Sequence, residues 1–298
     1  MGITKSSFRL LLEEAKKGNI KGKKILQLGR QHAFLTFSDA INLAKKAKFQ
    51  YHPPTHIQLS FNDELKNSNY IDDTTLFHLL GFNEVHSVDV SAYEQSTFVH
   101  DLNKPVPSEL HQQYDVVLDG GTLEHIFNVP QVFKNIHALL KEDGVIIHAS
   151  PSHNNVDHGF YMFSPTLFSE YYTTNVYKIL SSYIFEYGFE HNTSWTVYEY
   201  KPGCLDSLSF GGFGGNMLGV WFVAQKQSCS TEGIIPQQGA CRDQWSEQVA
   251  PHALNGEPSP IKDWLKKSSL LRSFVIKTRK KINQFKTKHF RLKKIGTF

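Results

Sequence analysis

The chain has 298 residues, of which 40% are hydrophobic and 13% aromatic, enough for one large domain with a packed core and an appendage. No apolar run is long enough to span a membrane and MGITKSSFRL lacks a signal segment, so we expect a cytoplasmic protein. Three irregularly spaced cysteines argue against a disulfide framework or a zinc knuckle. The net charge of +4 is uneven: residues 261–298 carry 13 Lys or Arg and one Asp, a net +12, which leaves −8 for the rest.

The first 150 residues alternate between helical and strand patterns. Helices are predicted over residues 7–18, 39–49, 72–82 and 129–144, with Thr36 or Ser38 capping the second and Gly144 ending the fourth. Apolar, β-branched runs predict strands over residues 23–29, 84–91, 96–102, 114–120 and 144–151. Such alternation predicts an α/β fold with a mostly parallel sheet, helices on both faces, and a ligand site beyond the carboxyl ends of the strands.

The second half is different in character. Residues 164–177 predict a helix, and aromatic-rich residues 182–191, 194–200 and 217–226 predict antiparallel strands, the last two joined by a glycine-rich hairpin connection, LSFGGFGGN. Residues 227–260, rich in Gln, Ser, Pro and Gly, indicate a linker or a loosely packed excursion. The predicted organisation is therefore a domain over 1–226, this linker, and a basic amphipathic tail over 261–298.

One stretch carries a family resemblance. Residues 114–151, YDVVLDGGTLEHIFNVPQVFKNIHALLKEDGVIIHASP, resemble the class I S-adenosylmethionine-dependent methyltransferases from their fourth strand, through a Leu-Glu-His turn and a helix, to their fifth strand. SVDVSAYE at 87–94 and HDLNKPVP at 100–107 look like the family's second-strand acid and third-strand Asp-Leu turn. The resemblance covers residues 22–226 and implies a Rossmann-like methyltransferase domain that takes S-adenosylmethionine as cofactor.

The first motif of that family is degenerate in this chain. Only Gly29 stands where the family has two or three glycines, and Arg30 follows it. The Arg30 guanidinium either pairs with the cofactor carboxylate or fills the pocket. Asp89 lies 60 residues after Gly29, about twice the distance in a simple βαβ unit, so residues 47–70 are an insertion that forms a lid or replaces lost contacts.

The resemblance assigns cofactor contacts to the strand ends. Asp89 ends an apolar strand and could accept hydrogen bonds from two ribose hydroxyls, the alternative being a helix N-cap. Asp101 would accept from the adenine amino group or cap a turn, and Leu102 would lie beside the adenine ring. Asp119 and Gly120 close the fourth strand, next to the methionine moiety and the transferred methyl group in the family.

Acceptor chemistry is predicted at two loops. His125 follows Glu124 directly after the fourth strand; the alternative is that Glu124 sits at a helix N-terminus, with His125 packed beneath it. The loop after the fifth strand holds His153, Asp157 and His158. A histidine there can take the proton of an attacking hydroxyl, whereas solvated histidines are the alternative. With no further ligands evident, we predict no metal.

The tail interleaves cations with large apolar residues. This mixture is typical of a segment that lies on an anionic membrane; packing against the acidic body and nucleic-acid binding are the alternatives. The sequence thus predicts a methyltransferase, cytoplasmic or peripheral at the inner face of the membrane, that O-methylates a small-molecule, sugar or lipid-linked glycan acceptor. A catalytically silent binding module and an RNA-modifying methyltransferase are the alternatives, and the oligomeric state is undetermined.

Overall fold

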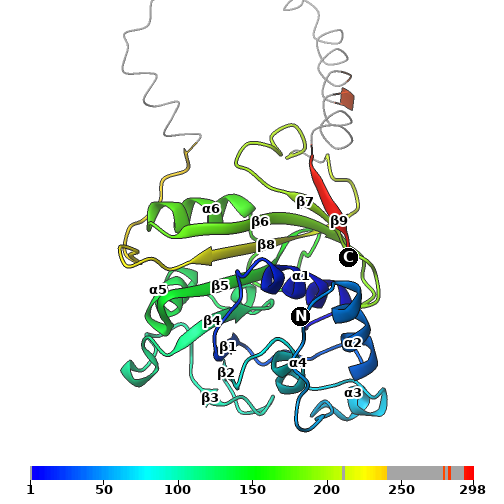
Figure 1. Ribbon diagram of the computed structural model, residues 1–298. Coiled ribbons are helices and arrows are strands. Elements are labelled where there is room, and N and C mark those ends of the chain that lie inside the picture. Colours follow the sequence, from blue (N-terminus) through cyan, green and yellow to red (C-terminus); the bar gives the residue numbers. More distant parts are fainter. Residues whose placement is uncertain (1, 210–211, 240–277, 279–280, 283–291) are drawn as a thin grey trace, which may run out of the picture.

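A single twisted sheet organises the chain (Figure 1). The computed structural model describes residues 2–209, 212–239, 278, 281–282 and 292–298. Within them the strand order is β3-β2-β1-β4-β5-β8-β6-β7-β9. The bounds are β1 Lys24–Leu28, β2 Glu84–Asp89, β3 Phe98–Val99, β4 Tyr114–Asp119, β5 Leu140–His153, β6 Lys178–Tyr187, β7 Thr196–Glu199, β8 Met217–Gln225 and β9 Lys294–Thr297.

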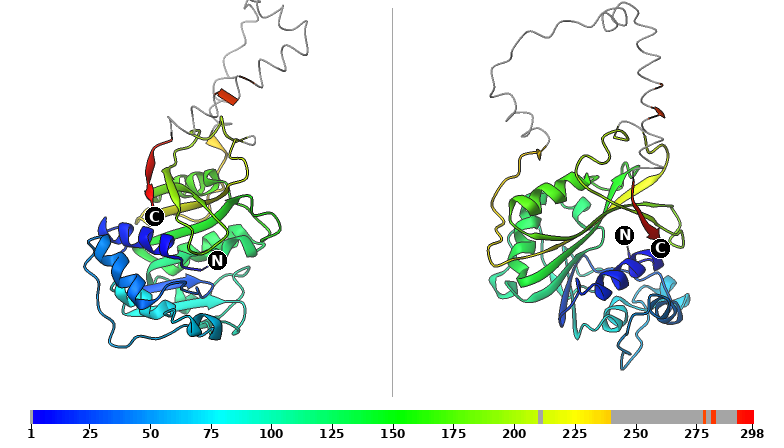
Figure 2. Two further views of the ribbon diagram at one scale, coloured as in Figure 1. Left: turned by 90° about the vertical axis from the view of Figure 1, so that its right-hand side faces the viewer. Right: turned by 45° about the horizontal axis from the view of Figure 1, so that its top comes forward.

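The sheet is parallel from β3 to β5 and antiparallel beyond. The helices are α1 Lys5–Lys16, α2 Phe37–Lys46, α3 Asp63–Asn67, α4 Asp73–Leu79, α5 Val129–Leu139 and α6 Pro165–Thr174, with 3₁₀ turns η1 Ser108–Leu110 and η2 Leu123–His125. Helices α1, α2 and α4 pack on one face, and α5 and α6 on the other (Figure 2). The predicted fold class is confirmed.

Alternation along the strands builds a core on each face. In β4, Val116 and Leu118 belong to the core under α1, α2 and α4, whereas Val117 faces α5 and α6. All three are at most 2% exposed. A buried parallel strand must be apolar on both sides, which is why YDVVLD reads as a continuous apolar run.

Two predictions were wrong, one about where a helix ends and one about which strands a loop connects. The helix expected to stop at Gly144 ends at Leu139, because Leu140 turns into the sheet, where it pairs with Tyr114 and is fully buried. Gly144 therefore lies within β5. The glycine-rich segment after β7 is not a hairpin connection, because β7 and β8 lie on opposite sides of β6.

The end of the predicted basic tail belongs to the sheet. Strand β9 pairs antiparallel with β7, and Lys293 forms an ion pair with Glu199 at 2.8 Å. The Ser6 hydroxyl of α1 donates to the Phe298 carbonyl at 2.8 Å, so the segment also contacts the start of the chain (Figure 1). Most of the tail, and residues 240–260 of the linker, lie outside the described residues. No helix among the described residues is both long and apolar enough to cross a membrane.

Candidate functional site

A cavity of about 560 Å³ opens at the carboxyl ends of β1, β2 and β4. We call it the rim cavity. Five residues singled out in the sequence for cofactor contacts line it: Gly29, Arg30, Asp89, Asp101 and Leu102. Of the residues predicted for acceptor chemistry, His125 lines it as well. None of residues 47–70 is among its lining residues.

The turn after β1 depends on its one glycine. Gly29 has φ +68°, and a side chain there would collide with the Thr122 hydroxyl. Its N–H donates to the Val88 carbonyl of β2 at 2.8 Å, while the Thr122 hydroxyl donates to the Leu28 carbonyl. The three neighbouring strand ends are therefore tied together at the floor of the rim cavity.

Arg30 neither fills the cavity nor offers a free guanidinium. Its Nε and Nη2 atoms donate to Asp73 Oδ1 at 3.1 and 3.0 Å, and its Nη1 donates to the Gln95 carbonyl at 3.1 Å. The guanidinium also lies 4.4 Å from the ring centroid of Phe61, a residue of the insertion. In this structure the Arg30 guanidinium therefore links the loop after β1 to Asp73 and to the Gln95 carbonyl.

Two acids mark the opposite wall. Asp89 is half-buried at the end of β2, and its Oδ1 accepts from the Ser91 N–H at 3.2 Å. No helix begins there, so the N-cap alternative does not hold. Asp101 accepts from the Asn103 N–H at 3.0 Å, as expected for a turn cap, yet still lines the cavity. Hydrogen bonds from Asn103 hold the pKa of the Asp101 carboxyl below its usual value.

Asp119 and Gly120 do not line the rim cavity. Asp119 is fully buried; its Oδ1 accepts from the Thr122 and Leu123 N–H groups at 3.0 and 3.1 Å, and its Oδ2 lies 2.7 Å from His148 Nδ1. Burial raises the pKa of the Asp119 carboxyl, but the hydrogen bond and charge of His148 outweigh it and lower the pKa. Asp119 therefore shapes the turn that carries Thr122, and Gly121 takes the place at the rim that was predicted for Gly120.

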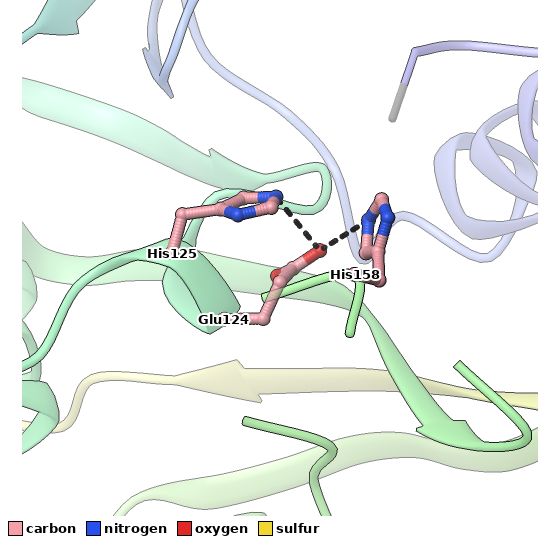
Figure 3. A group of neighbouring side chains, drawn as sticks. All are labelled: Glu124, His125 and His158. Atoms are coloured by element: carbon pink, nitrogen blue, oxygen red, sulfur yellow. Dashed lines mark ion pairs between the residues drawn. The ribbon is translucent and has the colours of Figure 1, made fainter. Parts of the chain in front are cut away.

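A cluster of one carboxyl group and two imidazoles lies beside the cavity (Figure 3). Glu124 Oε1 is 3.9 Å from His125 Nε2 and 3.8 Å from His158 Nε2, and the two imidazole centroids are 5.1 Å apart. The Glu124 side chain is 0% exposed, and neither of its oxygens has a hydrogen-bond partner among the residues that the structure describes. Four residues separate Glu124 from the start of α5, so it is not the helix N-terminal acid that was the alternative.

Burial dominates the electrostatics of this cluster. It raises the pKa of the Glu124 carboxyl to about 8, with repulsion from Asp119 as a second cause. Burial also lowers the pKa of both His125 and His158. A proton is therefore favoured on the carboxyl group and disfavoured on the imidazoles, the reverse of their order in water.

The other two predicted acceptor residues lie apart from the cluster. His153 lines a different cavity, where its ring lies 6.0 Å from that of Phe213. Asp157 is exposed at a turn, with φ +68°. Only His158 of the loop after β5 joins the group that follows β4.

A second, smaller cavity adjoins the rim cavity on the α1 side of the sheet. It has a volume of about 120 Å³, and its walls include Phe185, Trp195 and Trp221. Gly120 lines this aromatic cavity, and Gln31 lines both cavities. Gln31 and Thr122 were missed in the sequence, where neither follows a pattern that distinguishes it from ordinary loop residues.

The comparisons with known proteins are distant. No family model and no curated protein matches the sequence. Among solved structures, Burkholderia thailandensis 1,6-didemethyltoxoflavin-N1-methyltransferase, with its substrate and S-adenosylhomocysteine bound, is 13% identical over 75% of this chain and 78% of that one, with a TM-score of 0.36. Haemonchus contortus phosphoethanolamine N-methyltransferase 2, in complex with S-adenosyl-L-methionine, is 14% identical over 74% of this chain and 52% of that one, with a TM-score of 0.36.

At these scores neither likeness bears on activity or substrate, and the chain spans about half the length of the second protein. The fold is evident from the chain itself: five parallel strands in the order β3-β2-β1-β4-β5, antiparallel strands beyond them, and helices on both faces. The chain therefore has a Rossmann-like α/β fold with an antiparallel extension of its sheet.

Proposed function

We propose that the chain is a methyltransferase that binds S-adenosylmethionine in the rim cavity. The observation that carries this proposal is the order of groups along the cavity wall. Asp89 and Leu102 lie at the ends of β2 and β3, and Gly121 and His125 follow β4. The carboxylate of Asp89 suits the ribose hydroxyls, and the apolar surface of Leu102 suits the adenine base. The absence of a side chain at Gly121 allows the backbone to approach the amino-acid end of the cofactor closely.

Each of these residues has one task in binding. The Asp89 carboxylate accepts hydrogen bonds from the ribose hydroxyls, and Leu102, 5% exposed, presents a fixed apolar surface to the adenine ring. Gly29 and Gly121 leave room for the methionine end. Arg30 holds the loop and leaves the cofactor carboxylate to other donors, because Asp73 already occupies its guanidinium.

The cofactor supplies an electrophilic methyl group, and the chain supplies the position of its acceptor. His125 of the cluster lines the rim cavity, and a carboxyl group with two imidazoles is suited to handling the proton that a hydroxyl loses. The cluster therefore favours a hydroxyl as the acceptor group, and we propose a small molecule, a sugar or a lipid-linked glycan as the molecule that carries it.

The test is a calorimetric titration with S-adenosylmethionine and, separately, S-adenosylhomocysteine. We expect both to bind, and Asp89→Asn to weaken binding about 10- to 100-fold, because it removes hydrogen bonds to a charged acceptor. Asp63→Asn, an exposed acid on α3 away from the cavity, is the matched control and should leave affinity unchanged.

Unchanged affinity in a folded Asp89→Asn protein would refute the ribose assignment. Binding of neither compound by the unaltered protein would favour the alternative of a catalytically silent module that has kept the fold.

A further inference from the structure

We propose that Glu124, His125 and His158 form a binding site for one divalent first-row transition-metal ion at the edge of the rim cavity. Binding of the ion does not depend on the proposed function, whereas its role does. No metal was predicted from the sequence, because two of the three residues follow β4 and the third lies beyond β5.

The ligand set has a chemistry of its own. Two imidazole nitrogens and one carboxylate oxygen suit zinc, cobalt, iron or manganese, whereas magnesium and calcium prefer oxygen ligands alone. One ligand atom from each residue can be chosen so that all three lie within 4.8 Å of one another. Bonds of about 2.0–2.2 Å hold such atoms roughly 3–4 Å apart, so a small rotation of the histidines closes the site.

Burial of Glu124 is the second, independent observation. A carboxyl group that is 0% exposed should have hydrogen-bond donors, and within the described part of the chain neither oxygen of Glu124 has one. The nitrogens that face it belong to imidazoles whose side chains are 45% and 41% exposed, so an ion can reach the site from solvent. A cation between the three groups would satisfy the carboxylate and compensate its burial.

The backbone holds the three residues together. The Phe160 and Tyr161 N–H groups donate to the Glu124 carbonyl at 2.8 and 3.3 Å, which fixes the loop carrying His158 against the turn carrying Glu124. A side chain on Gly159 would lie 2.8 Å from that carbonyl oxygen, so this close approach needs glycine. His125 is held by its N–H, which donates to the Thr122 carbonyl at 3.0 Å. These contacts pre-position the ligands before any ion binds.

In the proposed reaction the ion would position and acidify the acceptor. Three protein ligands leave coordination positions open, and a hydroxyl oxygen bound there loses its proton to water more readily. That oxygen then forms a C–O bond with the methyl group while the C–S bond of the sulfonium breaks, and sulfur keeps the electron pair. The acceptor class favoured by this arrangement is an alcohol or phenol.

The experiment uses the untagged full chain, stripped with a chelator and dialysed. Titration with Co²⁺ is followed by visible absorption, and titration with Zn²⁺ by calorimetry. We expect one equivalent to bind, and Glu124→Gln, His125→Ala and His158→Ala each to weaken affinity by about 100-fold or more, since each removes a direct ligand. His191→Ala is the matched control: it lines the same cavity, stacks on Phe34 at 3.9 Å, and should change affinity less than threefold.

Failure of this proposal can be told apart from failure of the proposed function. Asp89→Asn should retain the metal, and His158→Ala should retain S-adenosylmethionine affinity. If Co²⁺ produces no ligand-field absorption, or if His191→Ala weakens binding as much as His158→Ala, the site is refuted whatever the cofactor result. His158 is exposed on a loop, so its variant will report even if Glu124→Gln unfolds.

Discussion

Gly29 is required for the backbone conformation of the loop after β1. The loop after β1 has a single glycine where the family that the sequence resembles has two or three, and this glycine has φ +68° and faces Thr122. Where the missing glycines would have allowed flexibility, a polar network holds the backbone: Gln27 Nε2 donates to Asp73 at 2.6 Å, and its Oε1 accepts from the Gln31 N–H at 3.2 Å. Side-chain hydrogen bonds thus take over the shaping of this turn.

Gly29→Ala should therefore destabilise the protein by about 2–4 kcal/mol, from the left-handed backbone and from the collision with Thr122. Thr122→Ala removes the collision but not the backbone strain. Unfolding in denaturant of the two single variants and the double variant separates the causes. We expect the double variant to lose less stability than the sum of the single ones. Simple additivity would show that the contact with Thr122 does not matter.

From the sequence, the place of a residue in the sheet could be predicted better than the side chains it contacts. Asp89 and Leu102 could be placed at the rim, because each follows an apolar strand whose end must face the same edge. Arg30 could not be assigned, because its partner Asp73 is 43 residues away and comes from α4. The same holds for Glu124 and His158: their proximity depends on how the loop after β5 folds back, which no local pattern encodes.

At the scale of elements, Asp115 joins three strands. Its Oδ2 accepts from the N–H groups of Lys23 and Lys24 at the start of β1, both at 2.9 Å, and its Oδ1 binds Lys141 of β5 at 2.9 Å. Burial raises the pKa of the Asp115 carboxyl, but the hydrogen bonds from Lys141, Lys23 and Lys24 outweigh it and hold the pKa below its usual value. Asp115 is therefore a link whose strength depends on pH.

The direction of that dependence follows from the lowered pKa. The folded state favours the ionised carboxylate, so its contribution is complete above the unfolded value near 4 and is lost as pH falls through the folded pKa. Asp115→Asn should cost about 1–2 kcal/mol at pH 7. Denaturant unfolding from pH 7 to pH 3 should show the gap to the unaltered protein narrowing below about pH 4. Asp63→Asn, exposed on α3, should show no such trend; a constant gap for Asp115→Asn would contradict the proposed link.

Helices and strands with a regular apolar period could be predicted from the sequence, whereas the residue at which a helix ends and a strand begins could not. The helix starting at Val129 was recognisable from its apolar spacing, but its end was not, because Leu140 fits a helix or a strand equally well until it finds Tyr114 on β4. Strand β9 was missed for a related reason. KIGT is short and follows a long basic segment, and only the free edge of β7 makes it a strand.

At the scale of the whole molecule, charge separates the body from its tail. The eleven Lys and Arg residues between 262 and 291 lie almost entirely outside the described residues, so membrane binding there remains a prediction. Strand β9 constrains how it can be tested. Deleting the whole of 261–298 would also remove Phe298, whose N–H donates to the Trp195 carbonyl and whose carbonyl accepts from the Trp195 N–H, both at 2.8 Å. A deletion would then confuse loss of folding with loss of binding.

Charge neutralisation avoids that difficulty. Replacing those eleven residues with glutamine keeps the chain length and β9, and should weaken binding to phosphatidylserine-containing vesicles at least tenfold, because each lysine near an anionic surface contributes about 1 kcal/mol. Vesicle binding is measured by sedimentation with anionic and with neutral vesicles, each at low and high salt. Binding of the unaltered protein to anionic vesicles should weaken as the salt concentration rises. A body variant, Lys45→Gln with Lys46→Gln, is the control, because both lysines are exposed at the end of α2. Equal sedimentation of all three proteins would refute the membrane prediction, whereas salt-sensitive binding to RNA but not to vesicles would favour nucleic acid as the partner.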